Sequence, residues 1–119
     1  MIRINCDVGE GMNNEEAIFP YIHSCSVACG GHAGDESSVR RIVQLAKQHN
    51  VKIGAHPSYP DQKNFGRKVM EIGVPELIQS VQEQVKLLID ICEEENVLVD
   101  HIKAHGALYH ELSENKELA

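Results

Sequence analysis

Short apolar segments alternate with longer amphipathic ones along the chain, and this alternation constrains the fold more than any other feature. Segments typical of strands lie at residues 2–6, 24–28, 51–55 and 97–104. Patterns typical of helices lie between and after them, at 14–21, 36–49, 75–92 and from 113 to the end. The two longest of these carry apolar stripes with a spacing near 3.6 residues. Strands that alternate with helices form parallel sheets, so we predict an α/β fold.

We predict a single domain over residues 1–119, because the sequence contains no repeat, low-complexity tract or Ser/Gly-rich linker. Consecutive βα units fit either a small open sheet or half of a (β/α) barrel. The segment 101–105 favours the barrel, because a period of two places His101, Lys103 and His105 on one face. The first strand repeats the pattern with Arg3, Asn5 and Asp7. Helices cover both faces of an open sheet, whereas a barrel interior accommodates such polar groups.

Composition excludes several classes of partner. The net charge is -7 and no basic stripe is present, so we predict no binding to nucleic acid. No apolar run approaches the ~20 residues of a bilayer span, and the first residues lack a signal-peptide core, so we expect a cytoplasmic protein without a membrane partner. The four cysteines are irregularly spaced and are interpreted as reduced thiols. Cys25 and Cys29 could form a metal pair, although a buried cysteine usually behaves as a small apolar residue.

Polar side chains follow each predicted strand, at the edge where ligands bind in parallel α/β folds. They are Asn5, Asp7 and Glu10 after the first, His32 and Asp35 after the second, His56, Tyr59 and Asp61 after the third, and Lys103 and His105 after the fourth. We therefore expect the side chains of Asp7, His32, His56 and His105 to converge at one mouth.

A carboxylate and several imidazoles in one pocket can hold a divalent metal or carry out acid–base chemistry. The candidate metal ligands are Asp7, His32 and His56, with Mg²⁺ or Zn²⁺ as the ion; the alternative is a structural hydrogen-bond network. Lys103 could supply positive charge to a substrate carboxylate or an oxyanion, or form an ion pair with Asp7 or Glu10.

Other polar residues have simpler interpretations. Asp35 is a good N-cap for the helix at 36–49, and Asp61 follows Pro60 in a turn. Three histidines are expected on the surface: His23, His49 and His110.

The Gly-rich run at 29–35 could cradle an anion at a helix N-terminus. Neither a P-loop nor a Gly-x-Gly-x-x-Gly motif is present, so a nucleotide would be held by other means or by another subunit.

Four stretches resemble, in order, the signatures of the LamB/YcsF family, which includes the A subunit of bacterial 5-oxoprolinase. They are NCDVGEG at 5–11, ACGGHAGD at 28–35, IGAHPSYPD at 53–61 with NFGR at 64–67, and KAHGALY at 103–109. The resemblance implies a (β/α) barrel of the glycoside hydrolase/deacetylase type, of which this chain matches the N-terminal half, about the first four βα units. Gly31 and Ala104 stand where the family usually has an aromatic residue and proline, so the pocket wall is expected to differ.

The resemblance also implies an activity: ATP-dependent hydrolysis of 5-oxo-L-proline to L-glutamate, with ATP as co-substrate and with B and C subunits as partners. Residues expected to be catalytic are Asp7, Lys103 and His105, and those expected to bind substrate are Asn5, Glu10, Tyr59 and Arg67. Two alternatives remain: a stand-alone metal-dependent amide or sugar-ester hydrolase, and a 5-oxoproline-binding subunit without catalysis. The first and fourth strands would have open edges, so we expect a homo-oligomer or another chain to cover them.

Overall fold

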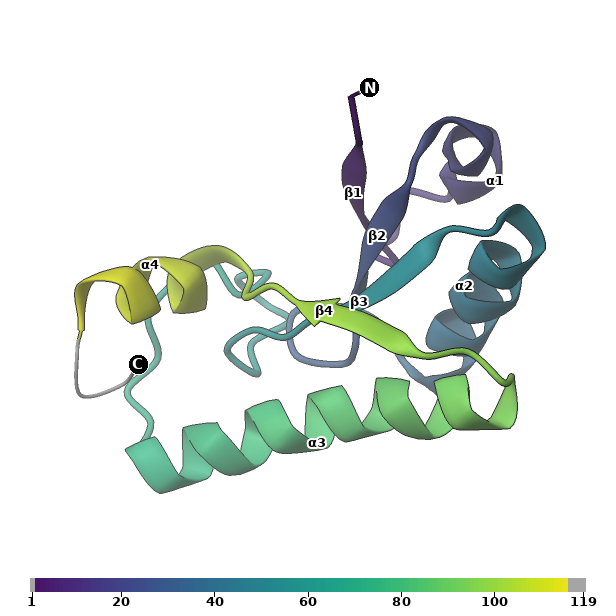
Figure 1. Ribbon diagram of the computed structural model, residues 1–119. Coiled ribbons are helices and arrows are strands. Elements are labelled where there is room, and N and C mark those ends of the chain that lie inside the picture. The colour runs from purple at the N-terminus through teal and green to yellow at the C-terminus, as the bar shows by residue number, and fades with distance from the viewer. Residues whose placement is uncertain (1, 116–119) are drawn as a thin grey trace.

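A parallel four-stranded sheet forms the centre of the computed structural model, which describes residues 2–115 (Figure 1). Its strands are β1 (Asn5–Val8), β2 (Ser24–Ala28), β3 (Lys52–His56) and β4 (Val99–Ile102). They pair in the order β1-β2-β3-β4, so each strand lies beside the next one in the sequence. This confirms the predicted α/β class, and the order is that of consecutive units of a (β/α) barrel.

Helical segments follow each strand. They are α1 (Glu15–Ile18), the 3₁₀ turn η1 (Phe19–Tyr21), α2 (Glu36–His49), α3 (Val74–Glu94) and α4 (Gly106–Glu114). The predicted start of the last helix was wrong, because α4 begins at Gly106 and not near Ser113. Its first turn is set by a contact distant in sequence, in which the Ala107 N–H donates to Gly66 O at 3.0 Å. The end of the predicted helix, at 116–119, lies outside the described residues.

The main apolar core lies between the sheet and the helices on one of its faces. Helix α2 packs on β2 and β3, α3 packs on β3 and β4, and the two helices contact each other. Figure 1 shows α3 running along β4 on this side. Val27, Ile42, Ile53 and Leu88 are completely buried there. The apolar stripes of α2 and α3 therefore cover the face of the sheet that carries Val27 and Ile53.

The opposite face of the sheet carries polar side chains that contact one another. Asn5 Nδ2 donates to Ser24 Oγ at 2.8 Å, and Ser26 Oγ donates to Asn5 Oδ1 at 3.2 Å. His101 Nε2 lies 3.1 Å from Ser26 Oγ and 3.3 Å from Asn5 Nδ2. The predicted common face of Asn5 and His101 is thus confirmed, and it is the face that would line a barrel interior.

Helix α2 begins with a capping box, which confirms the predicted role of Asp35. The Ser38 N–H donates to Asp35 Oδ1 at 2.8 Å, and the Asp35 N–H donates to Ser38 Oγ at 2.9 Å.

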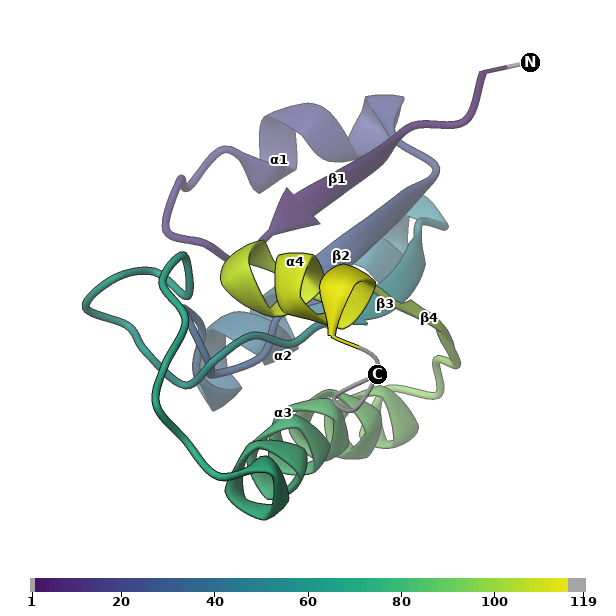
Figure 2. The same cartoon turned by 90° about the vertical axis from the view of Figure 1, so that its left-hand side faces the viewer.

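Figure 2 shows α4 in front of the sheet, beyond the carboxyl ends of the strands. Among the helices of residues 2–115, none combines the length and apolar character that a bilayer crossing requires.

The cysteines are free thiols within the described part of the chain. Burial raises the pKa of Cys25 to about 12, with Cys92 and Cys6 nearby adding to the rise. Burial also raises the pKa of Cys29 to about 11. Both side chains belong to the main apolar cluster, so they pack as small apolar groups.

Candidate functional site

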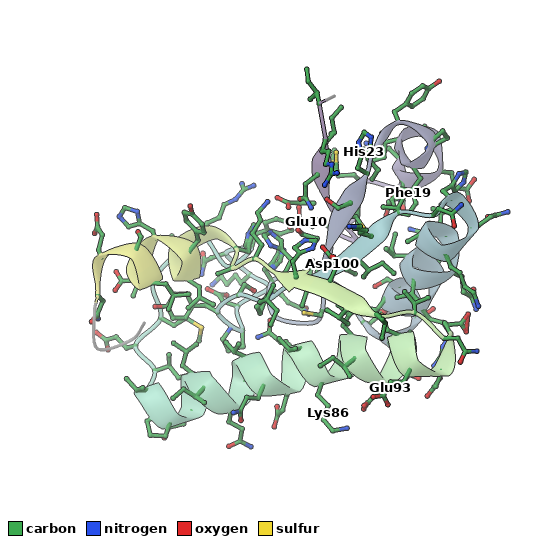
Figure 3. The ribbon with its side chains drawn as sticks, in the orientation of Figure 1. Glu10, Phe19, His23, Lys86, Glu93 and Asp100 are labelled. Carbon is green, nitrogen blue, oxygen red and sulfur yellow. The ribbon has the colours of Figure 1, made fainter. Side chains whose placement is uncertain are left out.

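Three buried imidazoles and one carboxylate meet beyond the carboxyl ends of the strands. Glu10 follows β1, His32 follows β2, His56 ends β3, and His105 caps α4. One potential ligand atom from each lies within 4.8 Å of the others, so the group could hold a metal ion. Figure 3 labels Glu10 among the side chains gathered at this edge. Asp7 joins them, with its Oδ2 3.5 Å from His56 Nε2, so the predicted convergence is confirmed.

Backbone carbonyl groups orient two of the imidazoles. His56 Nδ1 lies 2.6 Å from Lys103 O, and His105 Nε2 lies 2.9 Å from Phe65 O. A carbonyl oxygen can only accept a hydrogen bond, so these two ring nitrogens carry protons and donate. The remaining nitrogens, His56 Nε2 and His105 Nδ1, face each other at 3.1 Å.

His32 is held between Glu10 and Ser58. Its Nε2 lies 2.5 Å from Glu10 Oε2, and its Nδ1 lies 2.9 Å from Ser58 Oγ. The His32 ring also stacks on the His105 ring, with centroids 3.7 Å apart and planes 8° from parallel. Two different partners and one stacked ring therefore fix its orientation.

Ser58 and Gln84 support the site, and neither was among the residues predicted from the sequence. The Ser58 N–H donates to Gln84 Oε1 at 3.0 Å, and Gln84 Nε2 donates to Ser58 O at 2.9 Å. Gln84 is buried on α3, so these contacts depend on tertiary packing that no local pattern indicates. The same amide explains Gly31, because a Cβ at this position would lie 2.5 Å from Gln84 Oε1 and 2.4 Å from Ser58 Oγ.

The electrostatics favour neutral rings at His56 and His105 and an ionised carboxylate at Glu10. Burial alone would raise the pKa of Glu10, but the hydrogen bond from His32 and the charges of the three imidazoles hold this pKa below its ordinary value. Burial lowers the pKa of His56 and of His105. Neutral imidazoles offer lone pairs, which a metal ion or a proton can take.

Lys103 forms the ion pair with Asp7 that was predicted as one of its two roles. Its Nζ donates to Asp7 Oδ1 at 2.7 Å, and both side chains are partly exposed. Asn5 lies at the start of β1 on the polar face of the sheet and contacts Ser24, Ser26 and His101. Lys103 and Asp7 therefore border the imidazole group, whereas Asn5 contacts residues of the strands β2 and β4.

Arg67 stands at the rim of the site. Its guanidinium lies 5.1 Å from the centroid of the Phe65 ring, and its side chain is exposed. The Phe65 ring packs edge-on against His32 and His105, at centroid distances of 4.8 and 5.3 Å. An anionic substrate that reaches these imidazoles would pass close to the positive charge of Arg67.

Two other candidates have structural roles in the molecule. Tyr59 is 3% exposed and packs with Leu77, Ala107 and Leu108, and its contact with substrate stays a prediction. Asp61 accepts hydrogen bonds from the Asn64 N–H at 3.2 Å and from Asn64 Nδ2 at 2.7 Å, as expected for a turn residue. The three histidines predicted on the surface are all exposed: His23, His49 and His110.

A cavity of about 380 Å³ opens beside the imidazole group. Glu10 and His32 line it, together with Gly9, Ala33, Gly34 and the N-terminal turn of α2. The volume suits a small molecule, and the carboxylates of Glu10 and Asp35 are among the groups that line it.

Comparisons with known proteins agree with this geometry. The model of the LamB/YcsF family matches residues 2–119. The chain belongs to this family. LamB/YcsF relatives include proteins named as the A subunit of 5-oxoprolinase, from Staphylococcus epidermidis strain RP62A at 44% identity and from Haemophilus influenzae strain PittEE at 38%, each aligned over 99% of this chain. The crystal structure of the lactam utilization protein from Thermus thermophilus superposes with a TM-score of 0.93, at 34% identity over 98% of this chain.

These relatives are longer than this chain. The aligned region covers 49% of the S. epidermidis protein, 48% of the H. influenzae protein and 49% of the T. thermophilus structure. The chain therefore spans about half the length of the relatives it matches. The imidazole group and Asp7 all lie within the matched region.

Proposed function

We propose that this chain acts as the A subunit of 5-oxoprolinase, in an enzyme that opens 5-oxo-L-proline to L-glutamate with cleavage of ATP. The B and C subunits are its proposed partners. The observation that carries the proposal is the convergence of Asp7, Glu10 and three imidazoles within a region 44% identical to a protein named as the A subunit of 5-oxoprolinase.

The residues supply what opening a lactam requires. The substrate is a small cyclic amide with a carboxylate, and Arg67 and Lys103 offer the positive charge that binds it at the rim. An unstrained amide resists water, so transfer of the γ-phosphoryl group of ATP to the amide oxygen, with release of ADP, makes its carbon a better electrophile. One water molecule then adds at that carbon and the C–N bond breaks, which opens the ring to an acyl phosphate. A second water molecule hydrolyses the acyl phosphate to the side-chain carboxylate of L-glutamate and inorganic phosphate. The imidazole of His105 and the carboxylates of Asp7 and Glu10 are placed for one of two roles: to accept a proton of the water and return it to the leaving nitrogen, or to hold a metal ion that acidifies this water.

The experiment measures glutamate released by the chain co-expressed with B and C subunits. We expect release that depends on both 5-oxoproline and ATP. Asp7→Asn and His105→Gln should each lower the rate by about 10²-fold or more, as for the loss of an acid–base group. His110→Gln is the matched control, because this histidine is exposed on α4 and pairs only with Glu114 among the described residues.

Two results would contradict the proposal. Full activity of Asp7→Asn and His105→Gln would indicate a subunit that binds 5-oxoproline without catalysing its opening. Turnover of an N-acetylated substrate without ATP, and none of 5-oxoproline, would indicate a stand-alone hydrolase.

A further inference from the structure

Four acceptor atoms lie close together at the centre of the site, and His32 Nε2 supplies a donor to one of them, Glu10 Oε2. The ring protons of His56 and His105 are committed to Lys103 O and Phe65 O, so His56 Nε2 and His105 Nδ1 face each other with lone pairs at 3.1 Å. Glu10 Oε2 lies 3.6 Å from His105 Nδ1 and 4.0 Å from His56 Nε2. Asp7 Oδ2 lies 3.5 Å from His56 Nε2.

Lone pairs and negative charges directed at one point repel one another unless a positive charge lies between the atoms. A single shared proton could join the two rings, but it would not neutralise the negative charge of the Asp7 and Glu10 carboxylates beside them. A bound cation would be attractive to all four atoms together. Lys103 does not fill this place, because its Nζ bonds the other oxygen of Asp7.

The separations fit one small metal ion. Ligand atoms at ~2.0–2.1 Å from a tetrahedral zinc ion lie about 3.3 Å from one another. Four of the six separations between the acceptor atoms are 3.1, 3.5, 3.6 and 4.0 Å, so binding one ion would require small inward shifts of the carboxylates. Imidazole nitrogens favour zinc and other transition metals, whereas Mg²⁺ prefers oxygen ligands and retains water.

We propose that Asp7 Oδ2, Glu10 Oε2, His56 Nε2 and His105 Nδ1 bind one divalent cation of the zinc class. The inference rests on the proposed function only in placing the cation at the same site. When bound, such an ion would polarise a carbonyl oxygen or acidify a water molecule there.

His32 is a positioning residue and not a ligand in this arrangement. Its ring lies parallel to the His105 ring at 3.7 Å, so an ion in the plane of one ring lies well outside the plane of the other. A ring nitrogen binds a metal through the lone pair in its own plane, so the two rings cannot both coordinate well in these positions. His32 Nε2 instead donates to Glu10 Oε2, which holds that carboxylate toward the acceptor group.

The first test is calorimetric titration with Zn²⁺ of the full chain, stripped with a chelator, and titration with Mg²⁺ for comparison. We expect one Zn²⁺ per chain and a weaker response to Mg²⁺. His56→Gln and His105→Gln should each weaken Zn²⁺ binding by at least 100-fold, while His110→Gln leaves it unchanged. Absence of stoichiometric Zn²⁺ binding by the unmodified chain would overturn the proposal, as would unchanged binding by the folded His56→Gln and His105→Gln variants.

The second test counts ligands by X-ray absorption spectroscopy of the Zn²⁺-loaded, unmodified chain, and so does not depend on any variant folding. We expect two imidazole ligands, and the same two in His32→Gln, whose Zn²⁺ affinity should fall by 10–100-fold. Three imidazoles in the unmodified chain would overturn the assignment of His32. Both measurements need neither ATP nor substrate, so Zn²⁺ binding without 5-oxoproline turnover would contradict the proposed function alone.

Discussion

Gly54 on β3 pairs with Ser26 and His101, and the His101 ring lies against it on the polar face of the sheet. A Cβ at this position would lie 2.2 Å from His101 Nε2, and the three nearest atoms all belong to the His101 ring. Gly54 therefore makes room for a ring that bonds Ser26 and contacts Asn5. Gly54→Ala tests this, because the glycine has no positive φ and alanine suits its backbone.

The magnitude follows from what the His101 ring would lose. It would have to move by about 1 Å or more to reach an ordinary contact distance, and overpacking of this kind costs about 1–3 kcal/mol. The lost hydrogen bonds to Ser26 and Asn5 fall within that range. Replacing glycine by alanine in a compatible backbone stabilises by about 0.4–1 kcal/mol through the unfolded chain. We therefore expect Gly54→Ala to destabilise the protein by about 1–2 kcal/mol, as the difference of these two effects.

The assay is a double-mutant cycle in urea, in which the free energy of unfolding is taken from circular dichroism. In the His101→Ala background the clash is gone, so Gly54→Ala should be neutral or stabilising by up to about 1 kcal/mol. The urea dependence should be the same for all four proteins. An equal cost of Gly54→Ala in both backgrounds would refute the reasoning, because the cost would then come from the strand and not from the ring.

Three further predictions concern stability and accessibility. Asp35→Ala should lower the free energy of unfolding by about 1 kcal/mol through loss of the capping box, and Asp35→Asn should recover most of it in a thermal melt. Leu88→Ala should cost about 2–5 kcal/mol in a urea titration because Leu88 is fully buried, and Ile89→Ala, at a site that is 37% exposed, should cost less. Ellman's reagent should label the partly exposed Cys6 in the native protein and Cys25 only after unfolding, because burial raises the pKa of Cys25 to about 12; prompt native labelling of Cys25 would contradict this.

The sequence predicted the parts of the site that depend on strand order. His32 and His56 lie close together because each follows a parallel strand, and the positions of strands are visible as apolar segments. The supporting contacts were not predictable in this way. Gln84 lies on α3, and its bond to Ser58 exists only because the helix packs against the segment after β3. The start of α4 was missed for the same reason, since the Gly66 carbonyl that accepts from its first turn is distant in sequence.

The orienting acceptors of His56 and His105 belong to the main chain, and this affects how the site tolerates mutation. Replacing the side chain of Lys103 or Phe65 leaves the carbonyl oxygen in place, so substitution alone does not remove either hydrogen bond. The direction of the Phe65 carbonyl depends instead on the left-handed backbone at Phe65 and Gly66, with φ values of 53° and 66°. Insertions and deletions in the segment 57–66 should therefore disturb the orientation of the imidazoles more than most substitutions there.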